Sequence, residues 1–109
     1  MLSKNKRMLY ERQADILQAI GHPLRIAIAV FLKDGERCVC DIAEHIGSER
    51  SNVSRHLSVL VNAGLLDSRK QGLNVIYSLK CRCVLDFLSC ATKCLKLQVT
   101  ENNKLIKVL

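Results

Sequence analysis

The sequence predicts a mainly α-helical domain that carries one small β-hairpin. Two patterns indicate this class: apolar residues recur at helical spacing along much of the 109 residues, and they alternate with more exposed neighbours between Asn74 and Leu79. Aromatic residues are scarce, with two Tyr, two Phe and no Trp, so we expect a core of packed aliphatic helices. A chain of this length has room for one core, and we expect a single domain over residues 1–109.

The first part of the chain predicts two helices. Apolar residues at helical spacing indicate an amphipathic helix over Tyr10–Ile20, which Gly21 ends. Pro23 suits the first position of the next helix, because no hydrogen bond from its nitrogen is needed there. Residues 24–32 are apolar enough to form a buried helix, and we expect this helix to be the central core element.

Two further helices, separated by a short turn, follow. The third helix is expected to run from residue 40 or 41 to residue 46. Ser48 is suited to cap a fourth helix. The buried stripe of that helix has the spacing of one helix face and consists of Val53, Leu57, Leu60 and Val61. Ala63-Gly64-Leu65 ends the helix, because Gly can adopt the left-handed conformation there.

The remainder of the chain predicts a hairpin and a last helix. Strands are expected at 65–69 and 74–79, joined by a turn around Gln71-Gly72. A helix, a short turn, a second helix and a basic hairpin together predict a winged helix-turn-helix. The last helix is expected from about Cys83 to Leu97, so that the core spans about 9–97 and residues 98–109 form a tail of frayed helix or an edge strand.

The net charge is +7, and the positive excess is concentrated in the second half of the chain. Between positions 50 and 82 a single acid, Asp67, stands against six basic residues: Arg50, Arg55, Arg69, Lys70, Lys80 and Arg82. Such a distribution suits a polyanionic partner, with nucleic acid the first candidate and an anionic membrane the second. An ordinary solvated surface is the alternative interpretation.

The sequence indicates where the protein works. No apolar run approaches the ~20 residues needed to cross a bilayer, and the first residues lead into a charged stretch rather than an apolar signal segment. We therefore expect a cytoplasmic protein without a membrane partner. Thiols stay reduced in that compartment, so the six cysteines are expected to serve in metal binding, redox chemistry or packing.

Two motifs resemble those of the ArsR/SmtB family of metal-responsive repressors. Residues 36–45, Glu-Arg-Cys-Val-Cys-Asp-Ile-Ala-Glu-His, are similar to the family's metal-box motif. Residues 51–57, followed by 63–65, are similar to its recognition helix and the exit from that helix. The similarity covers about 9–97. It implies a winged-helix homodimer, joined through the first and last helices, that represses its own operon until an inducer binds.

The physical pattern of the fourth helix agrees with this resemblance. At 100° per residue Arg55 points almost directly away from the buried stripe, and its neighbours on that face are small polar donors suited to base edges and phosphates in a major groove. The candidate DNA-binding residues are Ser51, Asn52, Ser54, Arg55, His56 and Ser58 on the helix, and Arg69, Lys70, Gln71 and Asn74 on the hairpin. An ordinary polar helix face is the alternative, and His56 is equally suited to be a boundary residue at the edge of the apolar face.

The first cysteine pair departs from the family pattern. Sensing of arsenite or antimonite by the family implies three thiolates, and in its arsenic-type metal box a third Cys follows the first by five positions, where this chain has Ala43. A cadmium- or lead-type site would instead borrow a Cys from the partner's N-terminal segment, but residues 1–20 contain none. Cys38 and Cys40 therefore form an incomplete site and are the alternative metal ligands.

The remaining cysteines lie near the last helix and form the favoured metal site: Cys81, Cys83, Cys90 and Cys94. Cys83, Cys90 and Cys94 fall on one flank of this helix by angular count, and Cys90 and Cys94 are close enough along it to share an ion. The resemblance also implies a zinc site on this helix, whose ligands follow a fixed spacing in the family. When that spacing is aligned with this chain from Tyr77 onward, the ligand positions are occupied by Cys81, Cys83, Cys94 and Leu97. The alternative interpretation is that these cysteines only pack in the dimer interface and bind no ion.

These observations predict a homodimeric repressor that leaves double-stranded operator DNA when a thiophilic ion binds cysteine thiolates. As(III) or Sb(III) is favoured as inducer, with Cd(II), Pb(II) or Zn(II) as other candidates, and no organic cofactor is expected. A thiol redox or persulfide sensor of the same fold is the alternative. A structural zinc module is disfavoured by the Cys-x-Cys spacing, and an enzyme by the lack of a base and an orienting group beside any thiol.

Overall fold

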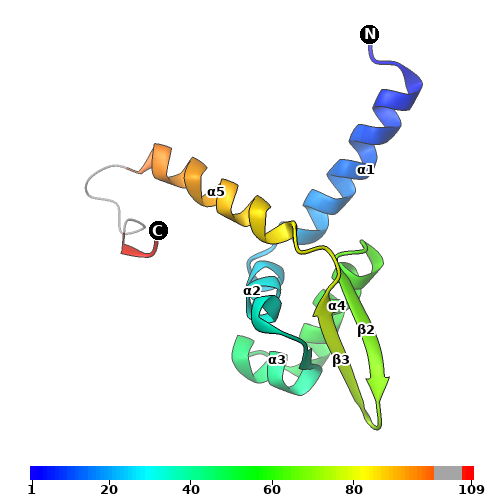
Figure 1. The fold of residues 1–109 in the computed structure, drawn as a ribbon, viewed down its shortest axis with the longest axis vertical. Coiled ribbons are helices and arrows are strands. Elements are labelled where there is room, and N and C mark those ends of the chain that lie inside the picture. The colour runs from blue at the N-terminus through cyan, green and yellow to red at the C-terminus, as the bar shows by residue number, and fades with distance from the viewer. Residues whose placement is uncertain (100–106) are drawn as a thin grey trace.

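A computed structural model describes residues 1–99 and 107–109 and confirms the predicted winged helix-turn-helix (Figure 1). The helices and strands follow in the order α1 (Lys4–Ile20), α2 (Pro23–Phe31), a 3₁₀ turn (Leu32–Asp34), β1 (Arg37–Cys38), α3 (Val39–Ile46), α4 (Arg50–Asn62), β2 (Leu66–Gln71), β3 (Asn74–Leu79) and α5 (Val84–Gln98). Most of the predicted tail, residues 100–106, lies outside the described residues.

The three strands form an antiparallel sheet in the order β1-β3-β2. The predicted hairpin is confirmed, and it is longer than expected, because β2 extends to Gln71, which pairs with Asn74. Gly72 takes a φ of 63° in the two-residue turn, a conformation that favours glycine. The short strand β1 was not predicted; it pairs Arg37 with Tyr77 and Cys38 with Ile76.

The core is aliphatic, as the scarcity of aromatic residues predicted. Its largest fully buried side chains come from α2, the 3₁₀ turn, α3, α4, β2 and the start of α5: Ile28, Leu32, Ile42, Leu57, Leu60, Leu66, Val53 and Val84. The side chains described contain no buried N or O atom that lacks a hydrogen-bond partner. This core fixes α3 and α4 against the sheet, so that the outer face of α4 and the β2-β3 hairpin lie on the surface.

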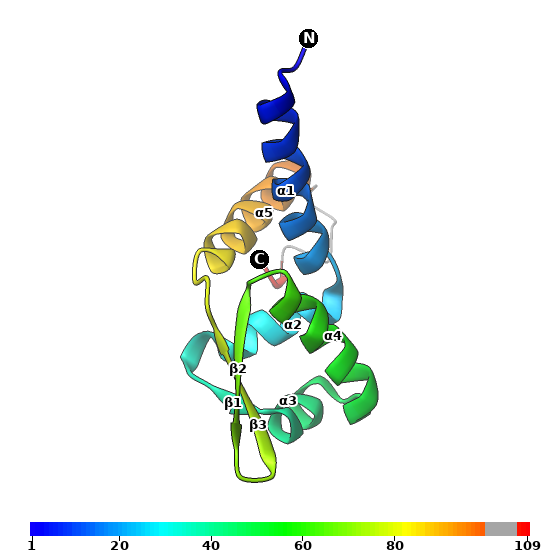
Figure 2. The same ribbon diagram turned by 90° about the vertical axis from the view of Figure 1, so that its right-hand side faces the viewer.

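Helices α1 and α5 project from this core in different directions (Figures 1 and 2). Helix α1 begins at Lys4 rather than at Tyr10, because the Ser3 side chain caps it by accepting a hydrogen bond from the Lys6 backbone N–H at 3.2 Å. Only Ala19 and Ile20 of this helix are buried. Within residues 1–99 and 107–109 no single helix is long and apolar enough to span a bilayer, although α1 and the Pro23–Asp34 segment pass that test as a pair bent by 82°.

Three further helix boundaries correct the predictions. Helix α3 begins at Val39, because the Cys38 sulfur accepts a hydrogen bond from the Asp41 backbone N–H at 3.3 Å. Glu49 rather than Ser48 is the N-cap of α4. Helix α5 begins at Val84, so the residue expected to start it, Cys83, is its N-cap instead.

Candidate DNA interface and thiol sites

Helix α4 separates its buried and exposed residues as the sequence predicted. Val53, Leu57 and Leu60 are fully buried against the core. Of the predicted DNA-binding residues, Ser51, Arg55 and Ser58 are exposed, whereas Asn52, Ser54 and His56 are half-buried. Helix α4 therefore presents a polar surface with Arg55 on its exposed side.

The polar groups of this surface are connected along the first turns of α4. Asn52 Nδ2 donates a hydrogen bond to Ser48 Oγ at 2.8 Å, and Arg55 Nη2 donates one to Asn52 Oδ1 at 3.4 Å. Asn52 thereby joins the turn before α4 to the exposed guanidinium. These contacts orient the Asn and Arg side chains while leaving most guanidinium N–H donors of Arg55 for a ligand.

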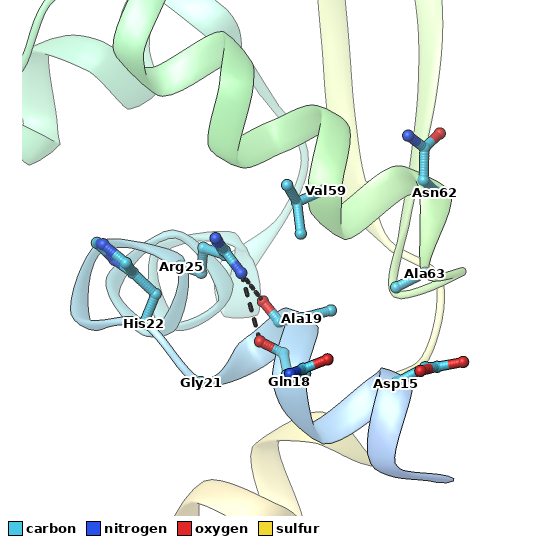
Figure 3. A pocket seen from close by; sticks show the side chains of 9 residues that line it. All are labelled: Asp15, Gln18, Ala19, Gly21, His22, Arg25, Val59, Asn62 and Ala63. Carbon is cyan, nitrogen blue, oxygen red and sulfur yellow. Dashed lines mark hydrogen bonds between the residues drawn. The ribbon is translucent and has the colours of Figure 1, made fainter. Parts of the chain in front are cut away.

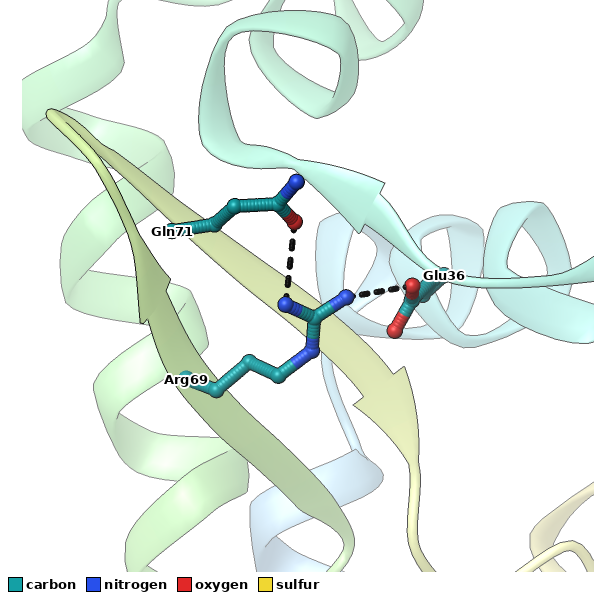
Figure 4. Close-up of polar contacts among 3 residues, drawn as sticks. All are labelled: Glu36, Arg69 and Gln71. Atoms are coloured by element: carbon teal, nitrogen blue, oxygen red, sulfur yellow. Dashed lines mark hydrogen bonds and ion pairs between the residues drawn. The ribbon is translucent and has the colours of Figure 1, made fainter.

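The hairpin carries the second group of predicted residues, and all four are exposed: Arg69, Lys70, Gln71 and Asn74. Figure 4 shows that the Arg69 guanidinium is held between two side chains. Its Nη1 donates to Gln71 Oε1 at 2.9 Å, and its Nη2 lies 2.5 Å from Glu36 Oε1. Sequence reasoning missed Glu36, because it is 33 positions away from Arg69 and belongs to a different segment.

His56 faces inward from α4 toward the start of α2. Its Nδ1 accepts a hydrogen bond from Arg25 Nε at 3.2 Å, and its ring centroid lies 4.4 Å from that of His22. Burial lowers the pKa of His56 below its ordinary value, and the neighbouring charges of His22, Arg25 and Arg55 lower it further. This position supports the boundary interpretation of His56.

Arg25 also reaches the end of α1, as Figure 3 shows. Its Nη1 donates to the backbone carbonyl of Ala19 at 2.9 Å and to that of Gln18 at 3.4 Å. An open pocket of about 600 Å³ lies here among α1, α2 and α4. One side chain therefore joins the three helices that surround this pocket.

The first cysteine pair lies where β1 passes into α3. The sulfurs of Cys38 and Cys40 are in contact, and their Cα atoms are 5.4 Å apart. Together with a carboxylate oxygen of Asp41, the two sulfurs lie within 4.8 Å of one another. Within the described residues this is the one group of three metal-ligating side chains so close together. Asp41 was not among the predicted ligands, although its position next to Cys40 was visible in the sequence.

The other four cysteines are not gathered into one group within the protomer. Cys81 and Cys83 precede α5, and their sulfurs are in contact, with Cα atoms 5.4 Å apart. Cys81 is half-buried against the core, whereas Cys90 and Cys94 are exposed on α5. A site that uses Cys81 and Cys83 together with Cys90 or Cys94 would require a second protomer.

Comparisons with known proteins agree on the class of the chain. Residues 22–68 match the family model described as bacterial regulatory protein, arsR family. The arsenical resistance operon repressor of Staphylococcus xylosus is 35% identical over 72 residues, which cover 66% of this chain and 69% of that protein.

Two solved structures are similar over most of their length. NolR from Sinorhizobium fredii superposes with a TM-score of 0.78 at 29% identity, covering 85% of this chain and 93% of that one. A homodimeric winged helix-turn-helix DNA-binding domain from Mycobacterium bovis gives a TM-score of 0.75 at 25% identity, covering 94% and 96%.

Proposed function

Because the chain belongs to the arsR family of bacterial regulatory proteins, we propose that it is a dimeric transcriptional repressor that binds operator DNA through α4 and the β2-β3 hairpin. A thiophilic ion bound by cysteine thiolates would release it from that DNA. This hairpin is the wing of the winged helix-turn-helix.

The observation that carries this proposal is the exposed polar face of α4 beside a basic wing. A major groove about 12 Å wide accepts one helix, whose side chains then reach base edges and phosphates. Arg55 is exposed on the outer side of α4, and Lys70 is exposed on the wing. In this arrangement Arg55 contacts bases or phosphates in the groove, whereas the wing contacts the flanking backbone.

Dimerisation is supported by apolar residues that α1 and α5 leave exposed. Leu17 of α1 is 56% exposed and Phe87 of α5 is 43% exposed, and both line an apolar pocket of about 350 Å³. A two-fold partner would bury these residues. It would also place two α4 helices about 34 Å apart, one turn of DNA. The similar domain from Mycobacterium bovis is described as homodimeric.

Two sets of cysteines are candidates for the inducer site. The favoured set combines Cys81 and Cys83 of one protomer with Cys90 or Cys94 of its partner, a thiolate-rich site suited to As(III) or Sb(III), and also to Cd(II), Pb(II) or Zn(II). The exposure of Cys90 and Cys94 supports it, since their sulfurs can be reached by a second chain. The alternative set is Cys38 and Cys40, for which the proximity of Asp41 supplies a third ligand atom.

DNA release tests the function directly. The reduced protein is mixed with a fluorescent DNA fragment from the promoter of its own gene, and anisotropy is followed while As(III), Cd(II) or Zn(II) is added. We expect the protein to bind the DNA in the absence of ion. We expect the DNA to be released once one or two ions are bound per dimer. Retention of the complex at saturating amounts of all three ions would exclude a metal-released repressor, and failure to bind any promoter fragment would exclude the DNA-binding function.

A thiol redox sensor is the second candidate, because both Cys-x-Cys pairs hold their sulfurs in contact. Closing a bridge removes two electrons and two protons from a pair, which a peroxide or polysulfide would accept. Release by such an oxidant in the presence of a chelator, and no release by ions, would favour this candidate.

A further inference from the structure

The guanidinium of Arg69, a candidate contact to DNA, is already bound to a carboxylate of this protein. Arg69 lies on β2 and Glu36 lies just before β1, so their ion pair crosses the middle strand β3 (Figure 4). Both side chains are about half exposed, 51% for Arg69 and 50% for Glu36. The pair therefore lies on the surface of the wing and not in the core.

The register of the sheet shows which face carries this pair. Arg69 and Cys38 both lie opposite Ile76, one from each neighbouring strand, and directly opposed residues point to the same side of a sheet. Gln71 lies two residues after Arg69 and shares this side. The Glu36 carboxylate and the Gln71 amide therefore hold the Arg69 guanidinium along the outer face of the sheet.

The chemistry of the pair makes it exchangeable. A guanidinium binds carboxylate and phosphate oxygens with the same N–H donors. Glu36 takes an Nη2 donor that a phosphate approaching the wing would use. An ion pair at such exposure is weak, because water screens it, so a phosphate of the DNA backbone can displace the carboxylate.

We infer that Glu36 is a positioning residue of the wing, which holds the Arg69 guanidinium in the free protein and yields it to a DNA phosphate on binding. This inference rests on the proposed function of DNA binding. Until the exchange occurs, Glu36 cancels one positive charge of the wing, so it reduces the affinity for all DNA sequences alike.

The test compares promoter DNA binding of the full protein with that of Glu36→Gln, Arg69→Gln and the double variant, over a range of salt concentrations. Gln keeps the size of the Glu side chain but removes its charge. We expect Glu36→Gln to bind about two- to fivefold more tightly at low salt, the range that corresponds to an exposed ion pair. Arg69 contacts the phosphate in both proteins, so the slope of log affinity against log salt should be nearly unchanged in Glu36→Gln, whereas Arg69→Gln should flatten it by about 0.9, the value for one phosphate contact.

Asp67→Asn is the matched control. Asp67 is an exposed acid on β2, the strand that carries Arg69, and it forms no ion pair within the described residues. This variant should tighten binding less than Glu36→Gln does. In the Arg69→Gln background the effect of Glu36→Gln should fall to that of the control. Unchanged or weaker binding by Glu36→Gln, or a full effect in the absence of Arg69, would overturn the inference.

A measurement without DNA separates this inference from the proposed function. The side-chain N–H signals of Arg69 in the nuclear magnetic resonance spectrum should shift and broaden in Glu36→Gln. Identical signals in both proteins would show that the ion pair does not form and would overturn the inference. If the signals change but no variant binds promoter DNA, the DNA-binding function fails and the exchange fails with it. If wild type binds and Glu36→Gln binds equally well, the exchange alone fails.

Discussion

Arg25 Nε donates a hydrogen bond to His56 Nδ1 at 3.2 Å and so joins α2 to the helix proposed to enter the DNA groove. The same guanidinium donates hydrogen bonds to the carbonyl groups of Gln18 and Ala19 near the end of α1. An acceptor nitrogen on His56 carries no proton, so this contact requires the neutral ring. The arrangement has consequences for pH dependence and for stability.

The protein should lose stability as the solution is acidified through the range in which His56 titrates. The folded-state pKa of His56 lies below its ordinary value of 6.5, so the unfolded chain binds this proton more readily. The contribution of His56 to the free energy of unfolding is therefore fully present above pH 6.5 and is lost as the pH falls through the lowered pKa. Thermal unfolding of wild type and of His56→Asn, which keeps an acceptor, should differ in this acid dependence.

The control for this prediction is His45→Gln. His45 is exposed and stacks on Phe31 at a ring distance of 3.9 Å, away from Arg25. This variant should keep the acid dependence of wild type. The assignment to His56 is wrong if His56→Asn loses stability with falling pH as steeply as wild type does.

Replacing Arg25 with Met should lower the free energy of unfolding by about 1 to 3 kcal/mol. Met keeps the apolar stem but removes the hydrogen bonds to His56 and to the end of α1, and bonds from a charged donor contribute in this range. Denaturation by urea at a fixed protein concentration measures the change. Arg12→Met, at an exposed position of α1, should stay within about 0.5 kcal/mol of wild type. Equal losses in the two variants would contradict the linking role of Arg25.

Arg55 and Lys70 should contribute to DNA binding in different ways. Arg55→Ala should cost about 1 to 3 kcal/mol and alter sequence preference, because Arg55 lies on the exposed side of α4. Lys70→Ala should weaken binding to all sequences alike and flatten the salt dependence by about one unit, as expected for a phosphate contact. Binding titrations with promoter and unrelated DNA distinguish the two. Unchanged affinity and salt slope in both variants would show that α4 and the wing do not form the interface.

Substitution of single cysteines should locate the inducer site. Changing Cys83 or Cys94 to Ser should leave DNA binding intact and abolish release, because coupling of ~1 to 3 kcal/mol between the ion and DNA would be lost. Changing Cys38 and Cys40 together to Ser should leave release largely unaffected. Release assays with a fixed excess of As(III) measure both. The opposite result would assign the site to Cys38, Cys40 and Asp41.

The protein should sediment as a dimer at micromolar concentration. Phe87→Glu should convert it to a monomer, because a carboxylate would be placed in the apolar surface between α1 and α5. Leu73→Glu is the control: Leu73 is also exposed and apolar, but it lies at the tip of the wing, and its replacement should leave the dimer intact. A wild-type protein that sediments as a stable monomer would contradict the proposed assembly.

Local periodicity made the central helices predictable, whereas contacts between distant segments were not visible in the sequence. The stripe of α4 follows directly from the spacing of Val53, Leu57 and Leu60. Strand β1 has two residues, too few to show alternation, and it exists because β3 supplies its hydrogen bonds. The start of α1 was missed because residues 4–7 carry no apolar stripe, and its signal was the cap at Ser3.

The candidate DNA interface was more accessible to sequence reasoning than the thiol sites. Exposure of Arg55 depends only on the rotation of one helix, which the buried residues define. The pairing of Arg69 with Glu36 depends on how three strands are ordered, and no local pattern encodes that order. The use of Cys90 and Cys94 depends on a second protomer, and it stays a prediction.

Helix α1 has 17 residues but buries only Ala19 and Ile20 within its own chain. In the proposed dimer the partner subunit would supply most of its stabilisation, which would link folding to the amount of protein present by mass action. The melting temperature should rise with protein concentration. When cell growth dilutes the protein, the folded, DNA-binding fraction would decline more steeply than the total amount of protein. The degree of repression would then depend on how much of the protein the cell contains.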